Sequence, residues 1–105
     1  MSVLVIADII NNELSIDLTG KTVNAVTHLG EVTILCASDD AKNASIEASK
    51  INGVNSVLNV SDPLFKNGLA EPMSALIVEL SKDFEFIVSP ASAFGKNILP
   101  RVAAL

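Results

Sequence analysis

Four short apolar runs alternate along the chain with longer stretches in which apolar residues recur every three or four positions. The runs are rich in Val, Ile and Leu and predict strands over Val3–Ala7, Val32–Ala37, Val54–Val60 and Phe86–Val88. The first two runs are almost continuous rather than alternating. That pattern is typical of central parallel strands that helices cover on both faces.

The stretches between the runs predict three helices by their spacing. Their apolar stripes are Leu18, Thr22, Ala25, Val26 and Leu29; then Ala41, Ala44, Ala48 and Ile51; then Leu69, Met73, Leu76, Ile77 and Leu80. We expect Gly30 to cap the end of the first helix in the left-handed conformation, and Asp40 to cap the start of the second. Gly53 is expected to end the second helix, and Pro72 falls in the first turn of the third, where proline is tolerated.

A fourth helix is predicted to begin near Lys96, and its apolar face consists of Ile98, Leu99, Val102 and Leu105. No glycine, polar cap or strand follows this face. We therefore expect the 105 residues to be the first part of a longer protein, truncated at the C-terminal end.

The alternation of strands and helices predicts an α/β fold, a doubly wound parallel sheet with helices on both faces. This arrangement is Rossmann-like, of the adenine-nucleotide-hydrolase-like kind. The length predicts one domain over residues 1–105.

The charge and composition exclude several functions. The formal charge is −5 and no segment gathers Lys and Arg, so we expect no nucleic-acid partner. The single Cys36 excludes an internal disulfide and suits a reducing compartment. The opening residues lack the basic flank and cleavage pattern of a signal peptide, and no run is long enough to span a membrane. A cytoplasmic location is the expectation.

Candidate ligand-binding residues follow the first and the last predicted strands. Asp8, Ser89, Ser92, Lys96 and Asn97 would all lie at the carboxyl edge of the sheet, where open α/β folds bind ligands. Gly95-Lys96 is not a Walker A loop, because Pro90 stands where Gly is needed and Asn97 where Ser or Thr is needed. The segment DIINNEL after the first strand also lacks the GxGxxG fingerprint of dinucleotide binding.

No pair of a nucleophile and a base is visible, and no metal-ligand cluster. His28 is the only histidine and is expected on the surface. Cys36 lies between Leu35 and Ala37 and is interpreted as a small buried residue. We expect no catalytic residue.

The closing stretch ASAFGKNILPRVAAL resembles the corresponding segment of the electron transfer flavoprotein alpha subunit family. The resemblance extends through GLAEPMSALIVEL to the opening MSVLVIAD and so covers the chain. It implies an N-terminal domain fragment of an electron carrier and not an enzyme. In that family FAD is held mainly by a C-terminal domain, which these residues do not include.

The resemblance also implies a heterodimer with the electron transfer flavoprotein beta subunit, which holds AMP in many members. The intact heterodimer would take electrons from acyl-CoA dehydrogenases of fatty acid β-oxidation and related enzymes and pass them to a quinone reductase. Phe94, Ile98, Val102 and Leu105 are the interface candidates. The alternative is an adenine-nucleotide-binding α/β domain that uses the carboxyl edge.

Overall fold

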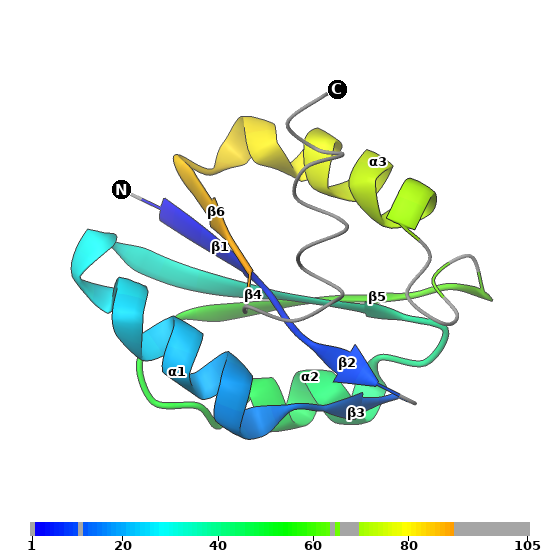
Figure 1. Ribbon diagram of the computed structural model, residues 1–105, viewed down its shortest axis with the longest axis horizontal. Helices are drawn as coiled ribbons and strands as arrows, with labels where there is room; N and C mark the ends of the chain where they lie inside the picture. The colour runs from blue at the N-terminus through cyan, green and yellow to red at the C-terminus, as the bar shows by residue number, and fades with distance from the viewer. Residues whose placement is uncertain (1, 11, 64, 66–69, 90–105) are drawn as a thin grey trace.

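The computed structural model describes residues 2–10, 12–63, 65 and 70–89 (Figure 1). Its strands are β1 (Ser2–Ile6), β2 (Ile9–Ile10), β3 (Glu13–Leu14), β4 (Glu31–Ser38), β5 (Ser56–Ser61) and β6 (Phe86–Val88). Its helices are α1 (Ile16–Val26), α2 (Lys42–Ser49) and α3 (Ala70–Leu80), with short 3₁₀ turns η1 (Thr27–Leu29) and η3 (Ser81–Asp83).

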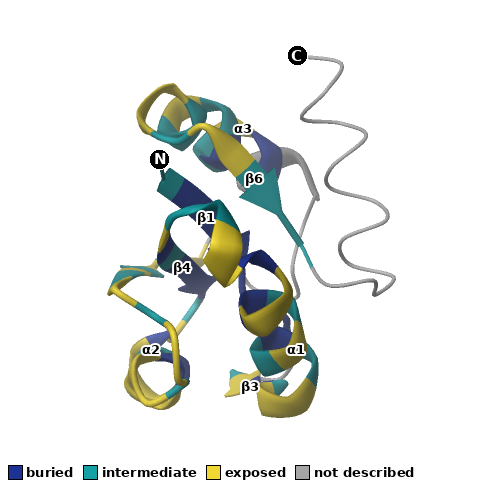
Figure 2. Cartoon of the chain, turned by 90° about the vertical axis from the view of Figure 1, so that its left-hand side faces the viewer, coloured by how far each residue is buried: buried dark blue, intermediate teal, exposed yellow. Residues whose placement is uncertain are grey.

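The main sheet has four parallel strands in the order β5-β4-β1-β6. Val3 on β1 stands opposite Val32 on one side and Phe86 on the other. The side chains of α1 and α2 pack on one face of this sheet, and those of α3 pack on the other. The α/β fold with a parallel, Rossmann-like sheet is therefore confirmed (Figures 1 and 2).

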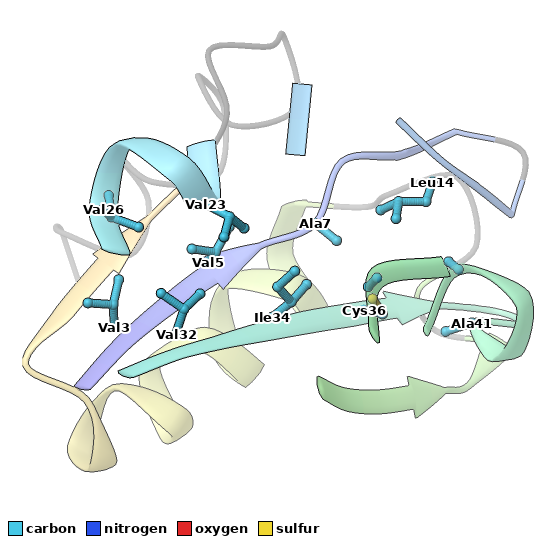
Figure 3. Close-up of a cluster of buried hydrophobic side chains, with 12 residues drawn as sticks. Val3, Val5, Ala7, Leu14, Val23, Val26, Val32, Ile34, Cys36 and Ala41 are labelled. Atoms are coloured by element: carbon cyan, nitrogen blue, oxygen red, sulfur yellow. The ribbon is translucent and has the colours of Figure 1, made fainter. Parts of the chain in front are cut away.

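The central strands are buried on both faces, as their continuous apolar runs predict. Val3 and Val5 belong to the core under α1 and α2, and Leu4 and Ile6 belong to the core under α3. All four side chains are at most 1% exposed. Figure 3 shows the first of these cores, where Val23 of α1 lies over β1 and β4.

The buried face of α1 differs from the predicted stripe. Thr19, Val23 and Val26 are buried, whereas Ala25 is exposed and Leu18 is only partly buried. The two candidate stripes share Val26 and lie next to each other on a helix of 3.6 residues per turn. The true stripe begins with the polar Thr19, whereas Leu18, Ala25 and Leu29 give the neighbouring stripe more apolar residues, so the pattern favoured the wrong one.

The expected cap at Gly30 was wrong as well. The α-helix ends at Val26 and continues as η1, and Gly30 then has φ 145° and ψ −159°. This is an extended conformation that is essentially confined to glycine, and it differs from the left-handed helical one.

Helix α2 has the predicted inner face, because Ala41, Ala44 and Ala48 are all buried. Its N-cap is Ala41 and not Asp40. The Asp40 Oδ1 accepts a hydrogen bond from the Lys42 amide at 3.3 Å. The Asp40 carboxylate therefore still satisfies an amide at the helix start, but from the position before the N-cap.

Strand β5 begins two residues later than predicted and includes Ser61. Asn55, just before it, bonds Val32 twice: its amide donates to the Val32 carbonyl at 2.8 Å, and its Oδ1 accepts from the Val32 amide at 3.0 Å. The Asn55 side chain thus accepts from the Val32 amide, where a main-chain carbonyl would accept in a regular ladder. This explains why β5 starts only at Ser56.

Helix α3 is confirmed where the structure describes it. Ile77 is fully buried, Leu76 and Leu80 pack against the same core, and the helix begins at Ala70, so that Pro72 lies in its first turn. The Leu69 and Met73 side chains and the predicted fourth helix from Lys96 lie outside the described residues.

A small antiparallel hairpin of β2 and β3 was not predicted. Ile9 stands opposite Leu14, and Asn12 in its turn has φ 64°, which Asn tolerates better than most residues. Leu14 is buried with Ala41 and Ala44, so the hairpin closes the core above α2. The alanines leave room for this close approach.

Candidate ligand-binding edge of the sheet

The carboxyl ends of the four parallel strands bring polar residues together at one edge. The Ala7 amide donates to the Leu35 carbonyl at 2.9 Å, so Asp8 follows β1 beside the end of β4. Ser38 stands opposite Ser61 in the register of β4 and β5. The chain runs from β1 outward to β5 and then crosses back to β6, so the direction of winding switches between β1 and β6. Ligands in open α/β sheets bind at such a switch point.

Two of the predicted candidates flank this switch point. Extending the register of β1 and β6 from Val5 and Val88 places Ser89 opposite Ile6, two residues before Asp8. The other candidates, Ser92, Lys96 and Asn97, lie outside the described residues, as do the interface candidates Phe94, Ile98, Val102 and Leu105.

Asp8 is only 4% exposed, which is unusual for a carboxylate. Its carbonyl accepts a hydrogen bond from the Ser15 amide at 2.8 Å, and this bond closes the base of the hairpin. The hairpin therefore stands between β1 and α1, where a dinucleotide-binding fold has a glycine-rich turn whose amides face a pyrophosphate.

Two amides at the start of α2 are also occupied. The Ser61 Oγ accepts from the Ala41 amide at 2.9 Å and donates to the Asn59 Oδ1 at 3.0 Å. The Asp40 carboxylate accepts from the Lys42 amide, so side chains of the chain itself occupy both amides. These groups fix the end of β5 to α2 and are not available to an anion.

The described part of this edge does not fit FAD or a nucleotide phosphate. Asp8, Asp39 and Asp62 follow three neighbouring strands, and their carboxylates would repel phosphate oxygens. The β2–β3 hairpin stands in place of the glycine-rich turn whose amides normally hold a pyrophosphate, and the Ala41 and Lys42 amides are already bonded to side chains.

Sequence reasoning missed Ser38, the last residue of β4. It is 5% exposed, and its hydroxyl has no hydrogen-bond partner within the described part of the chain. The sequence did contain a signal for Ser38, because this residue directly follows the apolar run of β4. A polar residue at the end of such a run is a candidate for burial.

Cys36 is completely buried, as its apolar neighbours predict. Burial raises the pKa of its thiol from 9.0 to about 11, and the nearby Ser45 side chain opposes this rise only in part. A thiol held neutral in this way is a poor nucleophile. His28 lies exposed in η1, and the described residues contain no group of three or more acids, histidines or cysteines that could hold a metal ion.

No helix within the described ranges is long and apolar enough to cross a membrane.

The chain is similar to alpha subunits of electron transfer flavoproteins. It is 50% identical over 105 residues to the electron transfer flavoprotein subunit alpha of Paracoccus denitrificans, covering 100% of this chain and 34% of that protein. It is 37% identical over 106 residues to the subunit alpha of Pseudomonas aeruginosa, again covering 100% of this chain and 34% of the relative. The mitochondrial subunit alpha of Dictyostelium discoideum is 38% identical over 97% of this chain and 31% of its own length.

The chain thus spans about a third of the length of the relatives it matches. The family described as electron transfer flavoprotein domain matches residues 5–105. With the parallel α/β sheet and the alpha-subunit relatives, this match shows that the chain belongs to the electron transfer flavoprotein domain family.

Proposed function

We propose that the chain is the N-terminal scaffold and subunit-interface domain of an electron transfer flavoprotein. In this proposal it forms a single domain that packs against the beta subunit, while FAD is held by a C-terminal domain that residues 1–105 do not include. The observation that carries the proposal is the match of residues 5–105 to the family, within relatives about three times as long.

The geometry of the sheet edge supports a structural role. A hairpin stands where a phosphate-binding turn would be, and Ser61 and Asp40 occupy the amides of Ala41 and Lys42 at the start of α2. Because burial raises the pKa of the Cys36 thiol, the chain's only thiol stays protonated at neutral pH and is a poor nucleophile. In this proposal the chain positions the flavin-binding half of the protein and transfers no electron itself.

The partners and location belong to the same proposal. The assembled heterodimer takes electrons from acyl-CoA and related dehydrogenases and delivers them to a quinone reductase, and it works in the cytoplasm. Phe94, Ile98, Val102 and Leu105 are proposed to lie in the interface, and any AMP is proposed to be held by the beta subunit.

The deciding experiment is a native mass spectrum of the purified chain, with and without a beta subunit, together with the absorbance of anything released on denaturation. We expect no flavin in the isolated chain and a one-to-one complex when the beta subunit is added. Stoichiometric flavin in the chain alone, or failure of the two chains to associate, would refute the scaffold proposal.

The same spectrum tests the adenine-nucleotide alternative. Adding AMP should leave the mass of the folded chain unchanged, since Asp8, Asp39 and Asp62 surround the described edge with negative charge. If the chain instead retains one AMP and loses it when Asp8→Asn is introduced, the edge is a nucleotide site.

A further inference from the structure

Asn52 and Gly53 form an exposed turn between α2 and β5. A single backbone bond closes the turn, from the Val54 amide to the Ile51 carbonyl, and at 3.3 Å it is long. Gly53 has φ 97°, a conformation that glycine adopts without strain. The Gly53 amide makes no hydrogen bond within the described part of the chain. No protein hydrogen bond within the described residues therefore holds this amide, in a residue that is exposed.

We propose that Asn52 is a site of spontaneous covalent modification in the folded protein, by deamidation to aspartate and isoaspartate. The Gly53 nitrogen gives its proton to a solvent base and attacks the side-chain carbonyl carbon of Asn52. The bond from that carbon to the amide nitrogen breaks, and the nitrogen leaves as ammonia. Water then opens the resulting succinimide at either carbonyl, which yields aspartate or isoaspartate.

The other described asparagines are poorer candidates, and among them Asn12 is followed by Glu13 and not by glycine. Asn24 and Asn43 lie within α1 and α2, where the helix fixes the amide of the next residue. The Asn55 side chain is bonded to the Val32 amide, and the Asn59 side chain accepts from Ser61. Only Asn52 combines exposure, a following glycine and an unbonded amide among the residues that the structure describes. The absence of a side chain on Gly53 also removes the steric barrier to ring closure.

Modification would change this connection in two ways. Conversion to either acid makes the formal charge of −5 one unit more negative. Isoaspartate also routes the backbone through the side chain and so lengthens the turn. Gly53 has little room to move, because a Cβ built on it would lie 2.8 Å from the Thr27 Cγ2 and 3.6 Å from the Val23 Cγ1. The isoaspartate form should therefore loosen the contact of this turn with the end of α1.

The test is to incubate the folded chain at mildly alkaline pH and map the peptides by mass spectrometry over time. We expect the peptide containing Asn52 to gain the mass of an amide-to-acid conversion and to accept methyl groups from a protein isoaspartyl methyltransferase. Asn52→Gln should abolish both signals in that peptide, since the longer side chain closes a ring far more slowly. Circular dichroism of the same samples checks that the chain remains folded.

Asn67 provides a comparison in the same chain, because Gly68 follows it in the sequence. Modification at Asn67 without modification at Asn52 would overturn the proposal. So would modification of Asn52 that appears only in denaturant, or persistence of the signal in Asn52→Gln.

Discussion

Thr19 shows how one polar atom can weaken an otherwise apolar core. Its side chain lies on the buried face of α1 at 0% exposure, and its hydroxyl has no hydrogen-bond partner in the described structure. A buried hydroxyl without a partner loses its bond to water and gains nothing in return. This cost arises at the first buried residue of the face that joins α1 to the sheet.

We expect Thr19→Val to stabilise the chain by about 1 kcal/mol, because valine has the same shape and no hydroxyl to satisfy. Urea unfolding followed by circular dichroism measures the change. Thr22→Val is the matched control: the Thr22 hydroxyl already donates to the Leu18 carbonyl at 3.0 Å, so its removal should change stability by less than about 0.5 kcal/mol. If Thr19→Val destabilises instead, the Thr19 hydroxyl has a partner in solution, such as a buried water.

At the scale of the elements, two glycines have opposite requirements. Gly53 lies in the connection from α2 to β5 at φ 97°, with Thr27 close by. Gly20 lies inside α1, and a Cβ added there meets no atom within 4 Å. Glycine is needed at the first position and only weakens the helix at the second.

Gly53→Ala should therefore cost about 1–2 kcal/mol, from the positive φ and the 2.8 Å contact with the Thr27 Cγ2. Gly20→Ala should stabilise by about 0.5–1 kcal/mol. Thermal unfolding of both variants beside the unaltered chain gives the comparison. Equal effects of the two substitutions would show that the turn at Gly53 relaxes without strain.

The accuracy of the sequence predictions depends on the kind of element. Continuous runs such as Val3–Ala7 correctly predicted buried strands, because a strand covered on both faces requires apolar residues at every position. The face of α1 was predicted wrongly because the apolar Leu18 and Ala25 indicated a neighbouring stripe, whereas the polar Thr19 is buried. The hairpin of β2 and β3 was missed because two-residue strands carry almost no periodic signal, and only Asn12 marked the turn.

At the candidate edge, the sequence predicted only that Asp8 follows the first strand at the carboxyl end of the sheet, and the order β5-β4-β1-β6 then puts β1 next to the switch point. The burial of Asp8 and the use of the α2 amides by Ser61 and Asp40 could not be predicted, since both depend on contacts between segments far apart in the sequence. Chemistry at such an edge is decided by which polar groups are already bonded, and spacing along the chain does not show this.

For the molecule as a whole, the buried thiol of Cys36 links global stability to alkaline pH. Its pKa is 9.0 when the chain is unfolded and about 11 when it is folded. Below pH 9.0 the thiol is neutral in both states, so it does not lower the free energy of unfolding. Between these two values the unfolded chain loses the proton while the folded chain keeps it, so the free energy of unfolding falls as pH rises.

The expected loss over this window is up to about 3 kcal/mol, since each unit of pKa difference corresponds to about 1.4 kcal/mol. Urea unfolding at a series of pH values should show the decline in the unaltered chain. Cys36→Ala starts from a lower stability because it leaves a small cavity, but it should lose less as pH rises, since it has no buried thiol whose pKa differs between the two states. Parallel curves for the two proteins would mean that the core opens to solvent at this strand, because a thiol that water can reach would have the same pKa in both states.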